Sequence, residues 1–321
     1  PQCLHPRELG CMILPLLSSH AVSHMRLISY HFQGKVQLAV ELGQKVFLPL
    51  LDSRWDQRID SMLALIDAGD AALAQLKILA AEPEAASLCA FAPEQLSSPI
   101  PRPRQNVMCL GLNYKDHVAE TNTDPTQEVK LPRSPIVFTK AANSMNGPYS
   151  DIAIDTAISA KMDWESELAV IIGKGGIGIR EEDAMQHVFG YSVLNDVTAR
   201  DRQKWHKQFF IGKSYAGCCP MGPAIVTADE IADPHDLAIR SWVNGDLKQE
   251  SNTCHQIFSI ANVIAVLSQG MQLEAGDIIA TGTPEGVGYA RTPPEYLMPG
   301  DVVECEVEGI GKIANRITQR T

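Results

Sequence analysis

Beyond residue 105, the chain consists mainly of short runs in which apolar and polar residues alternate with the period of two that is typical of β-strands. Asn244 and Gly245 lie between two such runs and predict a tight hairpin. The predicted strands lie within residues 106–112, 134–140, 166–173, 190–196, 223–228, 237–251, 276–282 and 300–317. We therefore expect this part of the chain to be mostly β.

Helical periodicity is confined to a few segments. Apolar residues three and four apart predict a long helix within residues 54–82 and a shorter one over 259–270, where Gly270 fits the end of the helix. Short strands within residues 26–50 precede the first of these helices. The segment before residue 98 is therefore predicted to form a small unit of its own.

Prolines at 93, 99, 101 and 103 favour an extended linker and a domain boundary near residue 100. The predicted fold class is α+β, mostly β. We expect a small N-terminal α+β domain over residues 25–98 and a main domain over residues 105–321. Residues 1–24 contain one acidic residue, Glu8, and resemble a leader or transit segment, so we exclude them from the fold.

Composition narrows the classes of partner. The chain has 321 residues, of which 45% are hydrophobic, and a formal net charge of −11. This charge argues against nucleic acid or a membrane as the partner, because both require a basic face, and an anionic substrate would have to be held by local cations. Eight cysteines without a CxxC pair favour reduced thiols in an intracellular compartment.

Two acidic residues stand at the start of the strand predicted over residues 166–173. Alternate side chains of a strand share a face, so Glu165 and Glu167 converge. Two carboxylates beside a core repel each other unless a cation or hydrogen bonds compensate, and a divalent metal ion would do so. The alternative is a solvated strand end, and Asp163, in the same alternation, leaves open which acids matter.

Asp196 ends another predicted strand and adds a third carboxylate. A set of carboxylates without a Cys or His cluster suits a hard cation such as Mg²⁺ or Mn²⁺ better than Zn²⁺. The segment GKGGIG, residues 173–178, also matches the GxGxxG pattern of dinucleotide sites. Because an extended segment rather than a helix follows these glycines, we favour a glycine-rich turn.

Two further groups carry candidate chemistry. His117 and Glu120 stand three residues apart on a predicted helix, where the carboxylate can orient the imidazole as a general base, although such a pair on a surface is often incidental. Lys213 lies among apolar and small residues, where an ammonium group needs an anionic partner.

Taken together, six segments resemble the fumarylacetoacetate hydrolase superfamily in their order along the chain. The resemblance covers nearly all of residues 105–321 and implies a mixed β roll that acts on 2-oxo acids or β-diketo acids. The segments are GLNYKDHVAE (111–120), DWESELAVIIG (163–173), NDVTARDRQ (195–203), GKSYAGCCPMGP (212–223), VNGDLKQESNT (243–253) and IIATGTPEGVG (278–288).

The resemblance also implies roles for individual residues. Glu165, Glu167 and Asp196 would hold Mg²⁺, with Mn²⁺ as the alternative. The implied catalytic residues are His117, Glu120 and Lys213, with Lys213 neutralising a distal carboxylate of the substrate. The implied substrate-binding residues are Tyr114, Arg200, Gln203, Thr281, Gly282 and Thr283.

One branch of the superfamily, which the whole chain resembles, implies Mg²⁺-dependent keto–enol tautomerisation of oxaloacetate through a metal-stabilised enolate. An acylpyruvase-type C–C hydrolase and an oxaloacetate decarboxylase are alternatives, because the same groups serve all three reactions. Acylpyruvase relatives often read Gly-Arg-Asn-Tyr where this chain has Leu112 between Gly111 and Asn113, which favours the tautomerase. A non-catalytic binding protein that keeps the fold is a further alternative.

The expected partner is thus a small 2-oxo acid. The resemblance further implies a homodimer. Together with the leader-like segment it favours a mitochondrial location, with the cytoplasm as the alternative.

Overall fold

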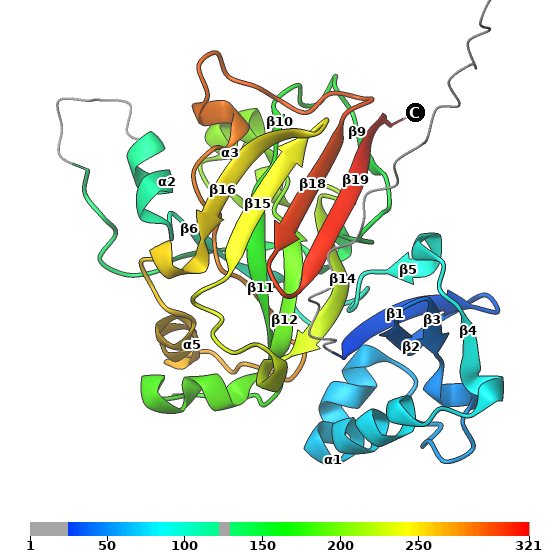
Figure 1. Cartoon of the computed structure of the whole chain (residues 1–321). Coiled ribbons are helices and arrows are strands. Elements are labelled where there is room, and N and C mark those ends of the chain that lie inside the picture. Colours follow the sequence, from blue (N-terminus) through cyan, green and yellow to red (C-terminus); the bar gives the residue numbers. More distant parts are fainter. Residues whose placement is uncertain (1–24, 122–128, 321) are drawn as a thin grey trace, which may run out of the picture.

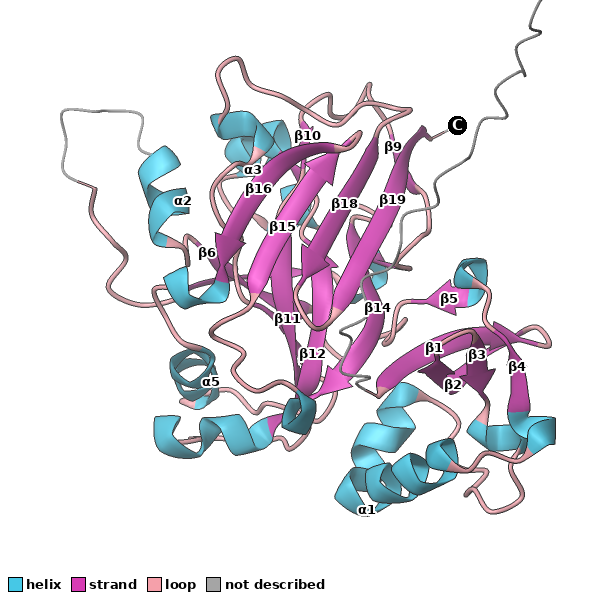
Figure 2. Ribbon diagram, viewed as in Figure 1, coloured by secondary structure: helices cyan, strands magenta, loops and turns pink. Residues whose placement is uncertain are grey.

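The computed structural model describes residues 25–121 and 129–320, in which two β-sheets pack against each other (Figures 1 and 2). The leader-like residues 1–24 lie outside the described part of the chain. The fold is the predicted one, mostly β with few helices. Among the described residues, no helix is both long and apolar enough to cross a membrane.

The larger sheet has twelve strands and runs in the order β4-β3-β2-β1-β14-β12-β11-β17-β6-β7, with β5 beside β1 and β8 beside β14. Most neighbours are antiparallel, but β17 and β6 are parallel, so the sheet is mixed. Its strands are β1 (Arg26–Phe32), β2 (Lys35–Leu42), β3 (Lys45–Phe47), β4 (Leu88–Ala90), β5 (Leu96–Ser97), β6 (Val107–Gly111), β7 (Ile136–Lys140), β8 (Met145–Asn146), β11 (Ser166–Ile172), β12 (Val188–Asn195), β14 (Cys219–Thr227) and β17 (Ile278–Ala280).

The smaller sheet has five strands in the order β16-β15-β18-β19-β9, and β10 pairs with β13 as a separate ladder. The hairpin predicted at Asn244-Gly245 is confirmed: both residues have positive φ, 53° and 84°, and they join β15 to β16. The bounds are β9 (Ile152–Ile154), β10 (Met162–Asp163), β13 (Thr198–Ala199), β15 (Ala238–Val243), β16 (Asp246–Asn252), β18 (Val302–Val307) and β19 (Gly311–Gln319).

α1 packs on one face of the N-terminal strands, and the other helices lie around the sheets (Figure 2). Both segments predicted from periodicity are helical, but the long one is broken at Gly69, where φ is 71°. The Ser259 hydroxyl accepts a hydrogen bond from Asn262 N at the start of α5, as a helix cap does. The bounds are α1 (Met62–Ala81), α2 (Lys115–Glu120), α3 (Arg200–His206), α4 (Phe210–Lys213) and α5 (Ile260–Ser268). Short 3-10 turns are η1 (Pro49–Leu51), η2 (Ala85–Ser87), η3 (Pro93–Gln95), η4 (Ala142–Ser144), η5 (Glu181–His187), η6 (Ala228–Glu230), η7 (Thr253–His255) and η8 (Gly288–Ala290).

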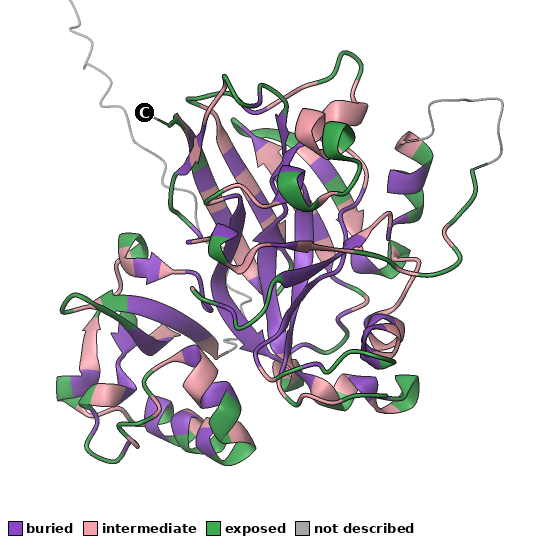
Figure 3. Cartoon of the chain, turned by 180° about the vertical axis from the view of Figure 1, so that it is seen from behind, coloured by how far each residue is buried: buried purple, intermediate pink, exposed green. Residues whose placement is uncertain are grey.

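β11 lies at the centre of the fold, and both of its faces are buried (Figure 3). Trp164, Leu168 and Val170 pack into the core between the two sheets. The opposite face of the strand packs into a second core, with Ala169 and Ile171 beside residues of α1 and the N-terminal strands. The acidic side chains on that opposite face are therefore held inside the protein rather than at a solvated strand end.

The N-terminal elements extend the large sheet. α1 packs on the first strands, and β1 pairs with β14 through Arg26–Val226 and Leu27–Ile225 (Figure 1). The proline-containing segment is not freely extended, because β5 pairs with β1 and Ile100 is fully buried. The predicted N-terminal unit thus shares both a sheet and a core with the rest of the chain.

The glycine-rich segment 173–178 is a turn that leads from β11 towards η5, and no helix begins at its glycines. The Gly176 amide donates to Leu273 O at 2.9 Å, and a Cβ added to Gly175 would lie 2.3 Å from the same oxygen. The glycines therefore permit a close approach of two backbone segments, which agrees with the predicted turn. A dinucleotide-binding GxGxxG motif is excluded, because it needs a helix that begins at its glycines.

Candidate active site

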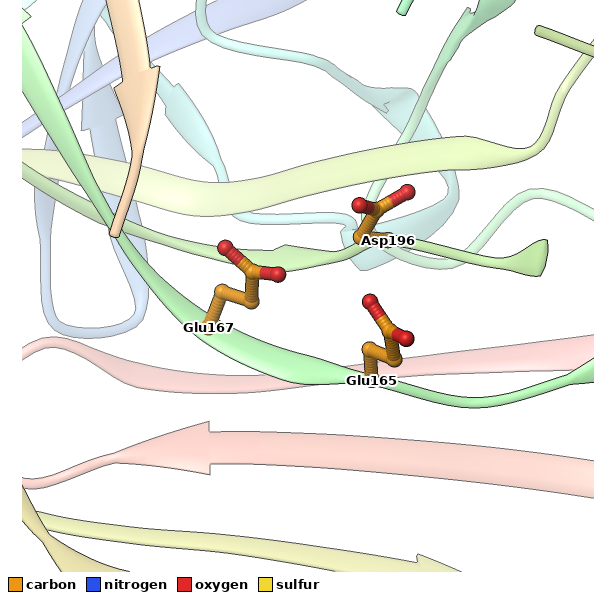
Figure 4. A group of neighbouring side chains, drawn as sticks. All are labelled: Glu165, Glu167 and Asp196. Atoms are coloured by element: carbon orange, nitrogen blue, oxygen red, sulfur yellow. The ribbon is translucent and has the colours of Figure 1, made fainter. Parts of the chain in front are cut away.

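Three carboxylates meet where β11 and β12 pair. Ser166 lies opposite Asn195, and Asp196 N donates to Glu165 O at 2.9 Å, so the residues just outside this pair are held side by side. One carboxylate oxygen each of Glu165, Glu167 and Asp196 lies within 4.8 Å of the other two, and all three residues are buried. Figure 4 shows the three side chains converging from the two neighbouring strands.

Two buried lysines neutralise part of this acidic triad, which comprises Glu165, Glu167 and Asp196. Lys213 Nζ donates to Glu165 Oε2 at 2.6 Å and to Asp196 Oδ2 at 2.8 Å. Lys140 Nζ donates to Asp196 Oδ1 at 2.7 Å and to Val197 O at 3.1 Å. Lys213 therefore has the anionic partner that its apolar sequence context requires, and that partner is the triad itself.

Arg200 links the triad to Asp163. Its Nε donates to Asp163 Oδ2 at 2.8 Å, and its Nη2 lies 2.7 Å from Glu165 Oε1 in an ion pair whose angle does not suit a hydrogen bond. Asp163 also accepts hydrogen bonds from the backbone amides of Gly288 and Tyr289. Asp163 thus orients Arg200 and fixes a neighbouring loop, and it lies outside the group that could hold a metal.

The four buried carboxylates outnumber the cations beside them, which are the buried Lys140 and Lys213 and the largely buried Arg200, and the excess falls on Glu167. Burial, together with repulsion from Asp196 and Glu165, raises the pKa of Glu167 well above its ordinary value. Burial also opposes the charged form of Glu165, but Lys213 and Arg200 outweigh it and lower its pKa to about 2. Without a metal ion, the charges balance when Glu167 carries a proton.

The triad fits a hard divalent cation. Glu167 Oε2 accepts from the Gly282 amide at 2.7 Å, whereas its buried Oε1 has no hydrogen-bond partner among the described residues. Such an oxygen needs either a proton or a cation, and three carboxylates suit Mg²⁺ or Mn²⁺. In place of the Glu167 proton, a divalent ion would leave this buried group with a net positive charge that attracts an anionic substrate.

His117 and Glu120 form the predicted pair on α2. His117 Nδ1 lies 2.7 Å from Glu120 Oε1, and the Gly286 amide donates to Glu120 Oε2 at 2.8 Å. The imidazole is largely buried and lines the same cavity as Glu165 and Lys213. Because Nδ1 is engaged by Glu120, Nε2 is the nitrogen available for proton transfer.

A cavity of about 650 Å³ reaches His117 and Glu165, whereas Glu167 and Asp196 lie outside its lining. Of the predicted substrate-binding residues, Arg200, Gln203 and Thr283 line it, and so does the predicted catalytic Lys213. Leu112, at a positive φ of 53°, also forms part of its wall. The cavity is therefore bounded by residues from widely separated parts of the chain.

The other predicted substrate-binding residues lie behind the cavity wall. Tyr114 is fully buried and its hydroxyl lies 3.4 Å from Gln256 Nε2. The Thr281 hydroxyl donates to Leu168 O at 2.9 Å, and the Gly282 amide is used by Glu167. In this structure Thr281 and Gly282 contact β11 and the triad, while Tyr114 contacts Gln256, and direct binding of substrate by the three residues stays a prediction.

Several residues at the site were not singled out from the sequence. Lys140 has a recognisable signal, because it shares a face with the apolar residues Ile136 and Phe138 at the end of β7. Tyr289, which stacks on Arg200 with 4.2 Å between the guanidinium carbon and the ring centre, has no such signal. Its position depends on the tertiary structure of the loop before η8.

Comparisons with known proteins agree with this geometry. The family profile described as "Fumarylacetoacetate (FAA) hydrolase C-terminal" matches residues 106–318, so the chain belongs to this family. The chain is 47% identical over 223 residues to oxaloacetate tautomerase YisK of Bacillus subtilis, covering 70% of this chain and 73% of that protein. It is 46% identical to the mitochondrial oxaloacetate tautomerase FAHD2A of Homo sapiens, covering 68% of each.

Solved structures show the same fold. A fumarylacetoacetate hydrolase from Exiguobacterium antarcticum superposes with a TM-score of 0.76 at 37% identity, covering 92% of this chain and 100% of that one. A maleylpyruvate hydrolase from Sphingobium sp. SYK-6, in complex with manganese(II) and pyruvate, superposes with a TM-score of 0.72 at 29% identity, covering 92% and 100%. The predicted superfamily and its mixed β roll are therefore confirmed.

Proposed function

We propose that this chain is an oxaloacetate tautomerase that interconverts the enol and keto forms. Relatives between 46% and 48% identical carry this name in bacteria and in animals. The observation that carries the proposal is the single cavity in which His117, Glu165 and Lys213 meet. A general base, a carboxylate suited to a metal ion and a cation thus face one bound molecule.

The chemistry needs a proton to move between the enol oxygen and the neighbouring carbon. A bound divalent ion would polarise the keto oxygen and stabilise the negative charge that develops there. His117 Nε2 is placed to exchange the proton at that carbon, while Glu120 fixes the tautomer of the ring through Nδ1. Arg200 and Gln203 line the cavity next to Glu165 and would orient the 2-oxo acid.

For Lys213 we propose a role different from the one that the resemblance implies. Its ammonium group is committed to Glu165 and Asp196, and these charges, against the opposing effect of burial, raise its pKa. Its ammonium group would therefore position the triad, and it lines the cavity while bound to Glu165 and Asp196. Neutralisation of a distal substrate carboxylate calls for other cations.

We propose Mg²⁺ as the cofactor, with Glu165, Glu167 and Asp196 as its ligands and Mn²⁺ as the alternative. The buried acidic triad and its unpaired oxygen support this assignment. Removal of divalent ions with a chelator should abolish the acceleration of tautomerisation, and added Mg²⁺ should restore it. Full activity in the presence of the chelator would contradict the assignment.

The reaction is tested by following the ultraviolet absorbance of enol-oxaloacetate with Mg²⁺ present while pyruvate is assayed in parallel. Accelerated loss of the enol without pyruvate is the expected result. Pyruvate formed in step with the loss of absorbance would replace the proposal with decarboxylation. Tight binding of oxaloacetate without acceleration would indicate a binding protein.

The variant H117A tests the base. We expect a loss of roughly 10²- to 10⁴-fold in kcat, the usual contribution of a general acid or base, with an unchanged circular dichroism spectrum. H31A, a change of an exposed histidine on β1, is the matched control and should retain full activity. An H117A protein with normal turnover would remove the dyad from the mechanism.

We also propose that the protein is a homodimer and that it acts in mitochondria, with the cytoplasm as the alternative location. The names of the eukaryotic relatives and the leader-like residues 1–24 support the location. Sedimentation equilibrium would test the dimer, and cell fractionation the compartment. A boundary near residue 100 is likewise a proposal, in the sense of two segments of the chain that share one core rather than two units that unfold independently; limited proteolysis between η3 and β6 would test it.

A further inference from the structure

Three lysines that line the cavity have no carboxylate partner among the described residues. Lys161, Lys204 and Lys207 are exposed, and none of them takes part in an ion pair with a described residue. By contrast, the two other cations that line the cavity, Arg200 and Lys213, are paired with buried acids. In a chain of net charge −11, this local excess of positive charge needs an explanation.

Two of these lysines lie on or next to α3. Arg200, Gln203 and Lys204 follow the spacing i, i+3, i+4, which places side chains on one face of a helix, and all three line the cavity, as does Lys207 just beyond the helix. Lys207 follows the helix with a positive φ of 60°. On another face, Arg202 lies over the Trp205 ring at 5.1 Å, and neither residue lines the cavity.

The third lysine comes from the segment before β10. Lys161 O accepts a hydrogen bond from the Arg200 amide at 3.0 Å, so Lys161 is fixed beside the start of α3. Its Nζ lies 5.9 Å from the centre of the Tyr296 ring, which also lines the cavity. The three ammonium groups therefore come from two segments that are joined at one wall of the cavity.

The acids at this cavity do not cancel the excess. Glu165 is paired with Lys213 and Arg200. Asp201 accepts hydrogen bonds only from uncharged donors, the Ser159 hydroxyl and the Arg202 amide, so it offsets one of the three lysine charges and leaves two. A lysine near the C-terminal end of a helix also interacts favourably with the helix dipole, which would be reason enough for Lys204 alone. The dipole does not account for Lys161, nor for the shared orientation towards one cavity.

Resting on the proposed function, we infer that Lys161, Lys204 and Lys207 form an anion subsite that selects doubly charged 2-oxo acids over singly charged ones. Glu165 of the triad, His117 and Lys213 line the cavity with buried side chains, and the 2-oxo acid group would react at this end. The exposed lysines lie at the solvent end, where the second carboxylate of a dicarboxylic substrate remains. They are specificity-determining residues that touch the substrate away from the reacting carbon.

The subsite is tested with the triple variant K161Q/K204Q/K207Q in the full chain with Mg²⁺. Two substrates are compared: oxaloacetate, and its monomethyl ester in which the carboxylate far from the keto group is masked. We expect KM for oxaloacetate to rise about tenfold, as three exposed charge pairs would predict, with little change in kcat. KM for the ester should stay constant, so that the preference of the wild-type protein for the dianion is lost.

Two controls make the result specific. The variant K35Q/K45Q/K174Q removes the same charge at exposed lysines outside this cavity and should leave both KM values unchanged. Raising the salt concentration should weaken the preference of the wild-type protein and have less effect on the variant, because exposed charges are screened.

The possible failures are distinguishable. Normal turnover with the same ratio of KM values in the wild type and the triple variant would overturn the subsite alone. A wild-type protein without preference for the dianion would do the same. If the wild-type protein does not accelerate the loss of enol-oxaloacetate, the proposed function is overturned, and the subsite with it.

Discussion

At the scale of single residues, Glu167 differs from the other two acids of the triad. Glu165 forms ion pairs with Arg200 and Lys213, and Asp196 forms ion pairs with two lysines. Glu167, in contrast, accepts a hydrogen bond only from the Gly282 amide. Burial and its acidic neighbours therefore raise the pKa of Glu167. At this proposed metal ligand, a metal ion would therefore compete with a proton for the same carboxylate.

A release of protons should therefore accompany metal binding. The folded metal-free protein keeps a proton on Glu167 to a higher pH than an ordinary carboxyl group does, and a bound Mg²⁺ would displace it, so affinity for Mg²⁺ should fall as the pH falls. Calorimetric titrations in two buffers of different ionisation enthalpy would measure the number of protons released. E167Q should abolish the release, and an unchanged release in that variant would contradict the assignment.

The raised pKa has a second consequence, for stability without metal. The unfolded chain loses this proton above about 4.5, whereas the folded chain keeps it to a higher pH. The metal-free protein should therefore lose stability as the pH rises from 4.5 towards the folded pKa, and Mg²⁺ should reduce that loss. Thermal unfolding would be measured at a series of pH values, with Mg²⁺ and with a chelator. The difference between the two unfolding temperatures should grow as the pH rises.

Lys140 permits a test of the buried charges that avoids the metal ligands themselves. It is fully buried, and its ammonium group contacts Asp196 and Val197 O. K140M should cost about 3–5 kcal/mol of the free energy of unfolding, because it leaves buried negative charge without a partner. Urea denaturation would measure this, with K45M, a change at an exposed lysine, as the control expected to have little effect.

At the scale of elements, the turn after β11 shows what can be predicted from the local sequence and what cannot. The segment 173–178 predicts a glycine-rich turn, and the structure has one. What the local pattern does not contain is its packing partner, because Leu273 lies about a hundred residues further along the chain. The same limit applies at the site, where Lys140, Tyr289 and Lys161 come together only through tertiary pairing.

Gly175 gives this element a direct test. A methyl group there would lie 2.3 Å from Leu273 O and 3.0 Å from Glu274 Cα, both backbone atoms that cannot move easily. G175A should destabilise the protein by about 1–3 kcal/mol, as overpacking does. Denaturant unfolding of G270A, where no atom lies within 4 Å of the added Cβ, is the matched control, and equal stabilities of the two variants would contradict the argument.

At the scale of the whole molecule, the sequence predicts which segments form strands better than it predicts which strands pair with each other. The alternating runs predict the strands, and the acids at 165, 167 and 196 are brought together as expected. The pattern before residue 98 predicts a separate unit, yet β1 continues the large sheet through β14 and Leu27 joins the same core as Ile171. Alternation describes one strand at a time and holds no information about which strands pair.

This continuity predicts a single cooperative unfolding transition. The N-terminal strands, α1 and the central strands share one hydrophobic core, so neither part should unfold while the other stays native. Differential scanning calorimetry should give one peak, shifted as a whole to higher temperature by Mg²⁺, since a ligand that binds only the native state stabilises all of it. Two separate peaks, of which only one responds to Mg²⁺, would show that the two parts unfold independently.

The register of β11 against β12 has a consequence for refolding. Because Ser166 must lie opposite Asn195 for the acids to meet, a slip of one residue would turn one strand's carboxylate away from the others. Chains trapped in a shifted alignment would be compact and rich in β-structure, but they would not bind divalent ions. Recovery of metal affinity during renaturation would therefore report on correct strand alignment, separately from the return of secondary structure.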